Sequence, residues 1–167
     1  MRASVLVNSK TTRLLVLLIT LLLILTACSL AGSPSNESAK GLPVVTVYKS
    51  PTCGCCGKWV DHLRANGFKV KVQKVSNIME TKQQYGVPEV LTSCHTAIVG
   101  DYIVEGHVPA KEVKRLLSEQ PDIAGLAVPG MPVGSPGMEV PGASPQPYNV
   151  IAFDRAGNTR VFAEYAE

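Results

Sequence analysis

Hydrophobic and polar positions follow two different periods in the middle of this chain, and each change of period marks where we expect a new element. Residues 44–48 are a β-branched apolar run, which predicts a buried strand. Residues 56–63 place their apolar side chains at helical spacing, and Gly67 follows as a stop signal. Residues 68–75 alternate apolar and polar side chains, as in a half-exposed strand. A folded domain therefore begins near Leu42.

The same two periods continue as far as Pro121. Residues 78–85 predict a short helix behind an Asn cap, residues 95–105 predict a hairpin with a two-residue turn, and residues 108–120 predict a last helix. Strands and helices thus follow one another in the order β-α-β-α-β-β-α. This order predicts an α/β domain over residues 42–122.

The composition shifts after that domain. Residues 123–147 are rich in Gly and Pro and carry Met131 and Met138, so we expect a loop without regular structure. A loop of this length in a compact domain is usually functional or disordered. Residues 148–167 regain strand character around a polar turn, which predicts a C-terminal β-hairpin packed on the domain.

The N-terminal segment has the features of an export signal. Three basic residues precede an apolar run over residues 14–25, and Leu25-Thr26-Ala27-Cys28 closes the run with small residues before a cysteine. This segment resembles a bacterial lipoprotein signal, and the alternative is an uncleaved membrane anchor. On the lipoprotein interpretation residues 1–27 are removed, Cys28 carries the lipid and residues 28–41 are a flexible tether. We therefore expect a lipid-anchored protein of the bacterial cell envelope that faces the periplasm or the cell exterior.

Charge argues against nucleic-acid binding. The whole chain has 16 basic and 13 acidic residues, but three of the basic residues lie in the predicted signal. The remaining chain is therefore balanced in charge and lacks the basic surface that nucleic acids require. Of the five cysteines, Cys28 is assigned to lipidation. Outside the cytoplasm the other four should be disulfides or metal ligands.

Three of these four cysteines, Cys53, Cys55 and Cys56, lie where the first predicted strand ends and the first helix begins. Unpaired backbone N–H groups and the helix dipole at that point favour thiolate over thiol, and thiolates attack disulfides and bind soft metals. Neighbouring cysteines converge poorly on the closed tetrahedron of a structural zinc, but they can bridge several Cu(I) ions. The spacing therefore favours a copper–thiolate cluster over zinc.

The element order, with a Cys-x-x-Cys opening the first helix, resembles the thioredoxin fold over roughly residues 42–120. In that fold a cis-proline at the start of the third strand packs against the Cys-x-x-Cys. Counting back from the hairpin turn by the strand length usual in thioredoxins places Ser93-Cys94 at this position, and Pro88 comes too early for it. We therefore expect the fourth cysteine to face the other three. The missing proline argues against an ordinary thiol-disulfide exchanger.

Three short motifs sharpen the resemblance. They are Pro51-Thr52-Cys53-Gly54-Cys55-Cys56-Gly57-Lys58-Trp59, Ser93-Cys94-His95-Thr96-Ala97 and Glu105-Gly106-His107-Val108-Pro109. Together they resemble the CopG-type copper-resistance proteins, a bacterial family of periplasmic metal-binding proteins with a thioredoxin-like fold, over roughly residues 43–140. The resemblance implies copper binding through these cysteines, and it allows a multinuclear cluster.

Further candidate ligands are histidines and methionines. His95 is a candidate copper ligand and equally a plain strand histidine, while His107, just before the last helix, is a candidate ligand or a structural residue. Met131 and Met138 are candidate thioether ligands, with an apolar lid as the alternative. Trp59 is expected in the core. His62 falls on the polar face of the first helix, where we expect it to be solvated.

The sequence therefore predicts a copper-binding envelope protein, more a binding protein than an enzyme, that acts in copper resistance or homeostasis. Its predicted thiolate ligands are Cys53, Cys55, Cys56 and Cys94. The expected partners are metal ions, the membrane through the lipid anchor, and other envelope copper-handling proteins. The alternative is a periplasmic thiol-disulfide oxidoreductase in which Cys53 attacks and Cys56 resolves.

Overall fold

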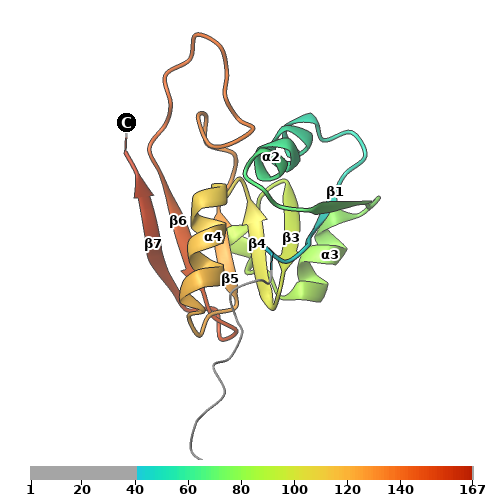
Figure 1. Cartoon of the computed structure of the whole chain (residues 1–167), viewed down its shortest axis with the longest axis vertical. Helices are drawn as coiled ribbons and strands as arrows, with labels where there is room; N and C mark the ends of the chain where they lie inside the picture. The colour runs from blue at the N-terminus through green and yellow to red at the C-terminus, as the bar shows by residue number, and fades with distance from the viewer. Residues whose placement is uncertain (1–40, 167) are drawn as a thin grey trace, which may run out of the picture. The chain divides into compact units, whose positions relative to one another are not determined.

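A computed structural model describes residues 41–166 of the chain (Figure 1). The predicted signal peptide, Cys28 and the predicted tether up to residue 40 lie outside the described residues. Across residues 41–166, no helix combines the length and the apolar character needed to cross a bilayer. The helices are α2 (Gly54–Ala65), α3 (Ile78–Tyr85), the short 3₁₀ helix η2 (Glu89–Leu91) and α4 (Ala110–Glu119). The strands are β1 (Val45–Lys49), β2 (Val70–Lys74), β3 (His95–Val99), β4 (Tyr102–Gly106), β5 (Gly125–Val128), β6 (Tyr148–Phe153) and β7 (Thr159–Tyr165).

The seven strands form one sheet in the order β2-β1-β3-β4-β5-β6-β7. Strand β1 runs parallel to β2 and β4 runs parallel to β5, while the other neighbouring pairs are antiparallel. The elements from β1 to α4 follow the predicted order, so the α/β fold class is confirmed. This order is the one expected for a thioredoxin-like core. Strands β5, β6 and β7 extend that core beyond β4.

Local sequence signals set the ends of the first two helices. Cys53 is the N-cap of α2, and its Sγ accepts a hydrogen bond from the backbone N–H of Cys56 at 3.4 Å. The side chain of Asn77 caps the start of α3 by accepting from two backbone N–H groups of its first turn. Gly86, with a φ of 72°, ends α3 in the left-handed region that glycine adopts without strain. The predicted helix over residues 78–85 is therefore confirmed.

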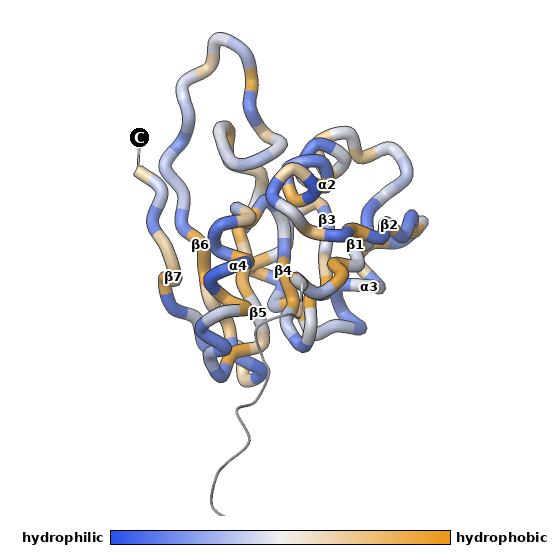
Figure 2. The backbone as a smooth tube through the Cα atoms, in the orientation of Figure 1, coloured by the Kyte–Doolittle hydropathy of each residue, from blue (hydrophilic) through white to orange (hydrophobic). Residues whose placement is uncertain are grey.

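Helices cover both faces of the sheet. Helices α2 and α4 pack on one face, over a core that includes Trp59, Leu63 and Leu116. The other face carries η2 and the end of α3, where Leu91 packs with Phe153. In Figure 2 the middle strands carry hydrophobic stretches, whereas the long loop after β5 is mostly pale. The fold therefore buries the middle of the sheet between helices.

One prediction about the C-terminal half was wrong. Part of the region that we expected to be a loop without regular structure forms β5, and all four residues of this strand are buried. The strand begins at Gly125, where a Cβ atom would collide with the backbone oxygen of Ile103. Glycine here permits the close approach of a neighbouring strand, so its presence does not mark a turn. Because β5 pairs with β6, the C-terminal hairpin joins the sheet directly.

Candidate metal centre

The cysteine motif lies at the start of α2, where the backbone leaves β1. Cys53 and Cys55 are half-buried and Cys56 is buried. Cys53 and Cys56 form a disulfide with a Cα separation of 5.5 Å, and the Sγ of Cys53 lies 3.5 Å from the Sγ of Cys55. One turn further, the indole N–H of Trp59 donates to the backbone oxygen of Val108 at 2.9 Å. The start of α2 is thereby anchored to the segment before α4.

Cys94 completes the sulfur cluster. It directly precedes β3, and the four Sγ atoms of Cys53, Cys55, Cys56 and Cys94 all lie within 4.8 Å of one another. The Sγ of Cys56 also lies 3.8 Å from the backbone oxygen of Cys94. The predicted proximity of Cys94 to the other three cysteines is therefore confirmed, and sulfur faces sulfur from two separate segments of the chain.

Two buried histidines meet Cys94. Nε2 of His107 lies 3.0 Å from the Sγ of Cys94, and Nδ1 of His95 lies 3.2 Å from the same sulfur. On its other side, the His107 ring places Nδ1 at 2.8 Å from the backbone oxygen of Pro136. A carbonyl oxygen can only accept, so Nδ1 carries the hydrogen and Nε2 presents its lone pair to Cys94. His107 is therefore held in the tautomer that a metal ligand requires.

His95 is fully buried, and its Nε2 has no hydrogen-bond partner among the described residues. Its ring centre lies 4.3 Å from that of Trp59 and 5.0 Å from that of His107. Burial lowers the pKa of His95 well below its usual value, and the charge that His107 carries when protonated and the charge of Lys82 lower it further. Burial also lowers the pKa of His107. Both imidazoles are therefore neutral at neutral pH, as metal ligation requires.

The surroundings of Cys94 favour its protonated form in the metal-free protein. Burial, together with the neighbouring Cys55 thiol, raises the pKa of Cys94 to about 12. Cys94 directly precedes β3, so it lies outside the first turn of α2, where the helix dipole assists thiolate formation. A metal that binds this sulfur must therefore displace its proton.

A charged pair is buried beside the cysteine site. Lys82 of α3 and Glu105 of β4 bring Nζ and Oε1 to 2.5 Å, and their side chains are 2% and 0% exposed. Thr96 accepts from Lys82 at 3.1 Å and donates to Glu105 at 2.7 Å, and the backbone N–H of Ser93 donates to Glu105 at 2.6 Å. Burial raises the pKa of Glu105, and Lys82 opposes this effect. We did not predict this network from the sequence. The feature that could have indicated it is the carboxylate of Glu105 within an otherwise apolar strand.

The loop after β5 packs on the start of α2. The backbone oxygen of Pro136 accepts the hydrogen bond from His107 described above. A Cβ added at the neighbouring Gly137 would lie 2.8 Å from the backbone nitrogen of Trp59 and 2.9 Å from the backbone oxygen of Cys55. The loop therefore touches both the helix that carries the cysteines and the histidine that faces Cys94.

The two loop methionines differ in how far they are buried. Met138 is half-buried and directly follows the glycine that contacts α2, whereas 51% of Met131 is exposed.

The prediction that His62 is solvated was wrong. It is half-buried, and its Nε2 accepts a hydrogen bond from the backbone N–H of Ala110, the first residue of α4, at 3.0 Å. His62 therefore links α2 to α4, because it accepts from a backbone N–H at the start of α4 that has no partner within that helix.

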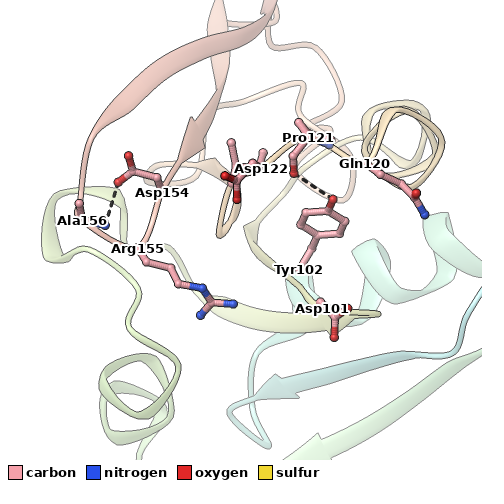
Figure 3. A pocket seen from close by; sticks show the side chains of 9 residues that line it. Asp101, Tyr102, Gln120, Pro121, Asp122, Asp154, Arg155 and Ala156 are labelled. Carbon is pink, nitrogen blue, oxygen red and sulfur yellow. Dashed lines mark hydrogen bonds between the residues drawn. The ribbon is translucent and has the colours of Figure 1, made fainter.

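A pocket also lies at the opposite end of β4 (Figure 3). Tyr102, where β4 begins, lines this pocket, whereas β4 ends at Gly106 beside the cysteine site. Figure 3 shows the Tyr102 hydroxyl donating to the backbone oxygen of Pro121, at 3.0 Å, and Asp154 accepting from the backbone N–H of Ala156, at 2.9 Å. The Tyr102 hydroxyl thus ties the start of β4 to the segment after α4, and Asp154 stabilises the turn between β6 and β7. Neither group has a part in the cysteine site.

The chain is similar to proteins that are already known. Two solved structures, described as copper resistance protein copG in form 2 and in form 1, are each 44% identical to this chain with a TM-score of 0.71. The matches cover 76% and 77% of this chain and 100% of the solved chains. A family model described as a protein of unknown function, DUF411, matches residues 91–138, a range that includes Cys94 and His107. The comparison with curated proteins found no match.

Proposed function

Because this chain belongs to the family of CopG copper resistance proteins, we propose that it binds copper through its clustered cysteines and acts in copper resistance or homeostasis. The observation that carries the proposal is the convergence of four Sγ atoms within 4.8 Å of one another. Thiolates select soft metals, and Cu(I) is the soft ion that copper offers in a reducing site. We therefore propose Cu(I) as the bound ion.

The spacing of the sulfurs supports a multinuclear site over a single zinc ion. Cys55 and Cys56 are adjacent in the chain, so their sulfurs do not converge easily on one tetrahedral ion, but each sulfur can bridge two ions. The disulfide between Cys53 and Cys56 must accept two electrons before all four sulfurs are thiolates. Copper loading is therefore linked to the redox state of the site.

Non-thiolate ligands around the cluster differ in how well the structure supports them. His107 presents a lone pair to Cys94 from a fixed tautomer, so it is the better supported nitrogen ligand. His95 is fully buried with Nδ1 toward the same sulfur, and it is the second candidate. Met138, which is half-buried, is favoured over the exposed Met131 as a thioether ligand.

The disulfide favours a second function, thiol-disulfide exchange. In this function a substrate dithiol attacks the disulfide, passes two electrons to it and becomes a disulfide itself, while Cys53 and Cys56 become thiols. Cys53 is half-buried and Cys56 is buried, so Cys53 is the sulfur that a partner can reach. Cys55 and Cys94 take no part in this exchange.

Four single variants distinguish the two functions. Fully reduced protein is titrated with Cu(I) without oxygen, against bathocuproine disulfonate as the competing chelator. If the sulfurs act as one cluster, Cys55→Ser and Cys94→Ser lower the copper stoichiometry as strongly as Cys53→Ser and Cys56→Ser. An oxidoreductase loses dithiol exchange only at Cys53 and Cys56. Normal copper uptake by Cys55→Ser and Cys94→Ser would remove the four-thiolate site.

We further propose that the protein is lipid-anchored in the bacterial envelope, where it meets other envelope copper-handling proteins. The support is the Leu25-Thr26-Ala27-Cys28 sequence, with small residues before a cysteine after an apolar run. The variant Cys28→Ser should then move the protein out of the membrane fraction. Mass spectrometry that finds residues 1–27 still attached, or Cys28 unmodified, would contradict the anchor.

A further inference from the structure

The buried pair of Lys82 and Glu105 needs an explanation other than stability. Both side chains are almost completely removed from solvent, with 2% and 0% exposed. Removing two charges from water costs several kcal/mol for each ion, and replacement of such a pair by apolar residues of similar volume is often neutral or stabilising. Apolar residues at the same two positions would therefore give the protein a similar free energy of unfolding. Its geometry points to a different role.

Three donors converge on the Glu105 carboxylate, and one of them belongs to the cysteine-bearing segment. Lys82 donates from α3, and Thr96 donates from β3. The third donor is the backbone N–H of Ser93, at 2.6 Å from Oε1. Ser93 precedes the first residue of β3, so its N–H lies outside the sheet ladder, and it is directly followed by Cys94. The carboxylate thus holds the backbone one residue before the fourth sulfur.

The same carboxylate lies close to His107 along the chain. Gly106 connects them with a φ of 71°, and a Cβ at Gly106 would lie 2.5 Å from the Cβ of Ser93. The backbone of Gly106 therefore lies directly against the side chain of Ser93, so the two segments that carry Cys94 and His107 are in contact at this glycine. Ser93 also donates from its hydroxyl to the backbone oxygen of Gly130, which ties the loop after β5 to the same point.

We propose that Glu105 is a positioning residue that holds Cys94 against His107 by accepting the backbone N–H of Ser93, with Lys82 as its counter-charge. The inference rests on the proposed function, because the site that it positions is the proposed copper site. Outer groups that orient ligands in this way commonly account for about 10- to 100-fold in metal affinity. Loss of the acceptor frees the Ser93 backbone while the apolar core remains intact.

Two variants separate positioning from folding. Lys82→Met/Glu105→Gln removes both charges but keeps a side-chain oxygen that can accept from Ser93. Lys82→Met/Thr96→Val/Glu105→Leu replaces the whole network by apolar side chains and removes the acceptor. Neither variant leaves an unpaired buried charge, so both should unfold at denaturant concentrations close to that of the parent protein. Thr96→Val alone is the control for the lost hydroxyl.

The first readout needs no metal. Under non-reducing conditions Cys53 and Cys56 are closed as a disulfide, and iodoacetamide labels the free thiols, which peptide mass spectrometry of the full chain resolves. We expect the apolar variant to alkylate Cys94 several-fold faster relative to Cys55 than the parent protein does. The Gln variant and Thr96→Val should keep the parent ratio. An unchanged ratio in a folded apolar variant would overturn the inference.

The second readout is Cu(I) affinity, measured against bathocuproine disulfonate after full reduction. The apolar variant should bind about 10- to 100-fold more weakly, and the Gln variant should bind like the parent protein. If the parent protein binds no Cu(I), the proposed function fails, and the alkylation ratio still decides the positioning role. Should the apolar variant not fold, Ser93→Pro removes the same hydrogen bond from the donor side, and Ser93→Ala serves as its control. A parent-like Cys94 ratio in folded Ser93→Pro would then overturn the inference.

Discussion

The Sγ of Cys94 lies 3.0 Å from Nε2 of His107, although the two residues are 13 positions apart. The register of the β3–β4 hairpin explains this relationship, because Thr96 pairs with Glu105 and the next positions along each strand reach the open end of the hairpin together. The hydrogen bond from His107 to Pro136 then fixes which nitrogen faces the sulfur. A thiol and a neutral imidazole are thus brought together by the fold before any metal binds.

The first prediction concerns this imidazole. His107→Ala should weaken Cu(I) binding by at least about tenfold, because it removes the lone pair that faces Cys94 and frees the loop at Pro136. The matched control is His62→Ala, which removes a half-buried histidine that joins α2 to α4 instead. Chelator competition on both reduced variants measures the affinities. Equal affinities for the two variants would show that His107 has no part in the site.

The second prediction concerns the loop that packs on α2. Gly137 and Gly142 share a left-handed backbone, with φ of 86° and 81°, so an alanine at either position meets similar backbone strain. At Gly137 the new Cβ would also press on the first turns of α2, whereas nothing lies within 4 Å at Gly142. Gly137→Ala should therefore destabilise the protein by about 1–3 kcal/mol more than Gly142→Ala. Urea unfolding of both variants provides the test, and equal midpoints would mean that the loop does not pack there.

The third prediction concerns pH and the stability of the metal-free protein. The folded state lowers the pKa of His95 well below its usual value of 6.5, so below that pH the unfolded chain binds a proton that the folded chain does not. Stability should therefore fall as pH drops from about 7.5 to about 5.5, and the fall should be smaller by about 1 kcal/mol in His95→Gln. The pKa values of His62 and His107 are also lowered in the folded protein, but both residues are present in the parent protein and in the variant. The difference between the two proteins in their loss of stability therefore reports on His95 alone. Urea unfolding of both proteins at the two pH values measures this loss. An equal loss of stability in the parent protein and in His95→Gln would contradict the burial of a neutral imidazole.

The fourth prediction concerns protons released by copper. Burial and Cys55 raise the pKa of Cys94 to about 12, so this thiol keeps its proton at neutral pH until a metal displaces it. Cu(I) affinity should therefore rise with pH, and loading of Cys94→Ser should release about one proton fewer than loading of the parent protein. Calorimetry in two buffers of different ionisation enthalpy counts the protons. The same proton count in both proteins would mean that Cys94 does not bind the metal as a thiolate.

Local chemistry explains why much of the fold was predictable. The bounds of α3 follow from an Asn cap at one end and a glycine at the other, and the cysteine-capped start of α2 follows from a strand that gives way to a helical period. Cys94 was located through the resemblance to the thioredoxin fold, by counting back from the hairpin turn over the strand length usual in that fold. Each of these signals lies within a few residues of the feature that it sets.

The features that sequence did not predict depend on contacts between distant segments. Strand β5 is a short apolar run inside a Gly- and Pro-rich region, and only its pairing with β4 and β6 makes it a strand. The Lys82 to Glu105 pair joins residues 23 positions apart, and neither residue has a local partner that marks it as buried. His62 likewise lies on the polar side of α2, where only the start of α4 gives it a role.

The number of copper ions that one reduced chain retains decides whether the four sulfurs form a cluster. Fully reduced protein is loaded with Cu(I) without oxygen, passed through a desalting column, and examined by native mass spectrometry with bathocuproine disulfonate as a competitor. The four-thiolate cluster predicts that the parent chain retains more than one Cu(I) and that Cys94→Ser retains fewer. A fully reduced, folded chain that retains no copper against the chelator would contradict the account.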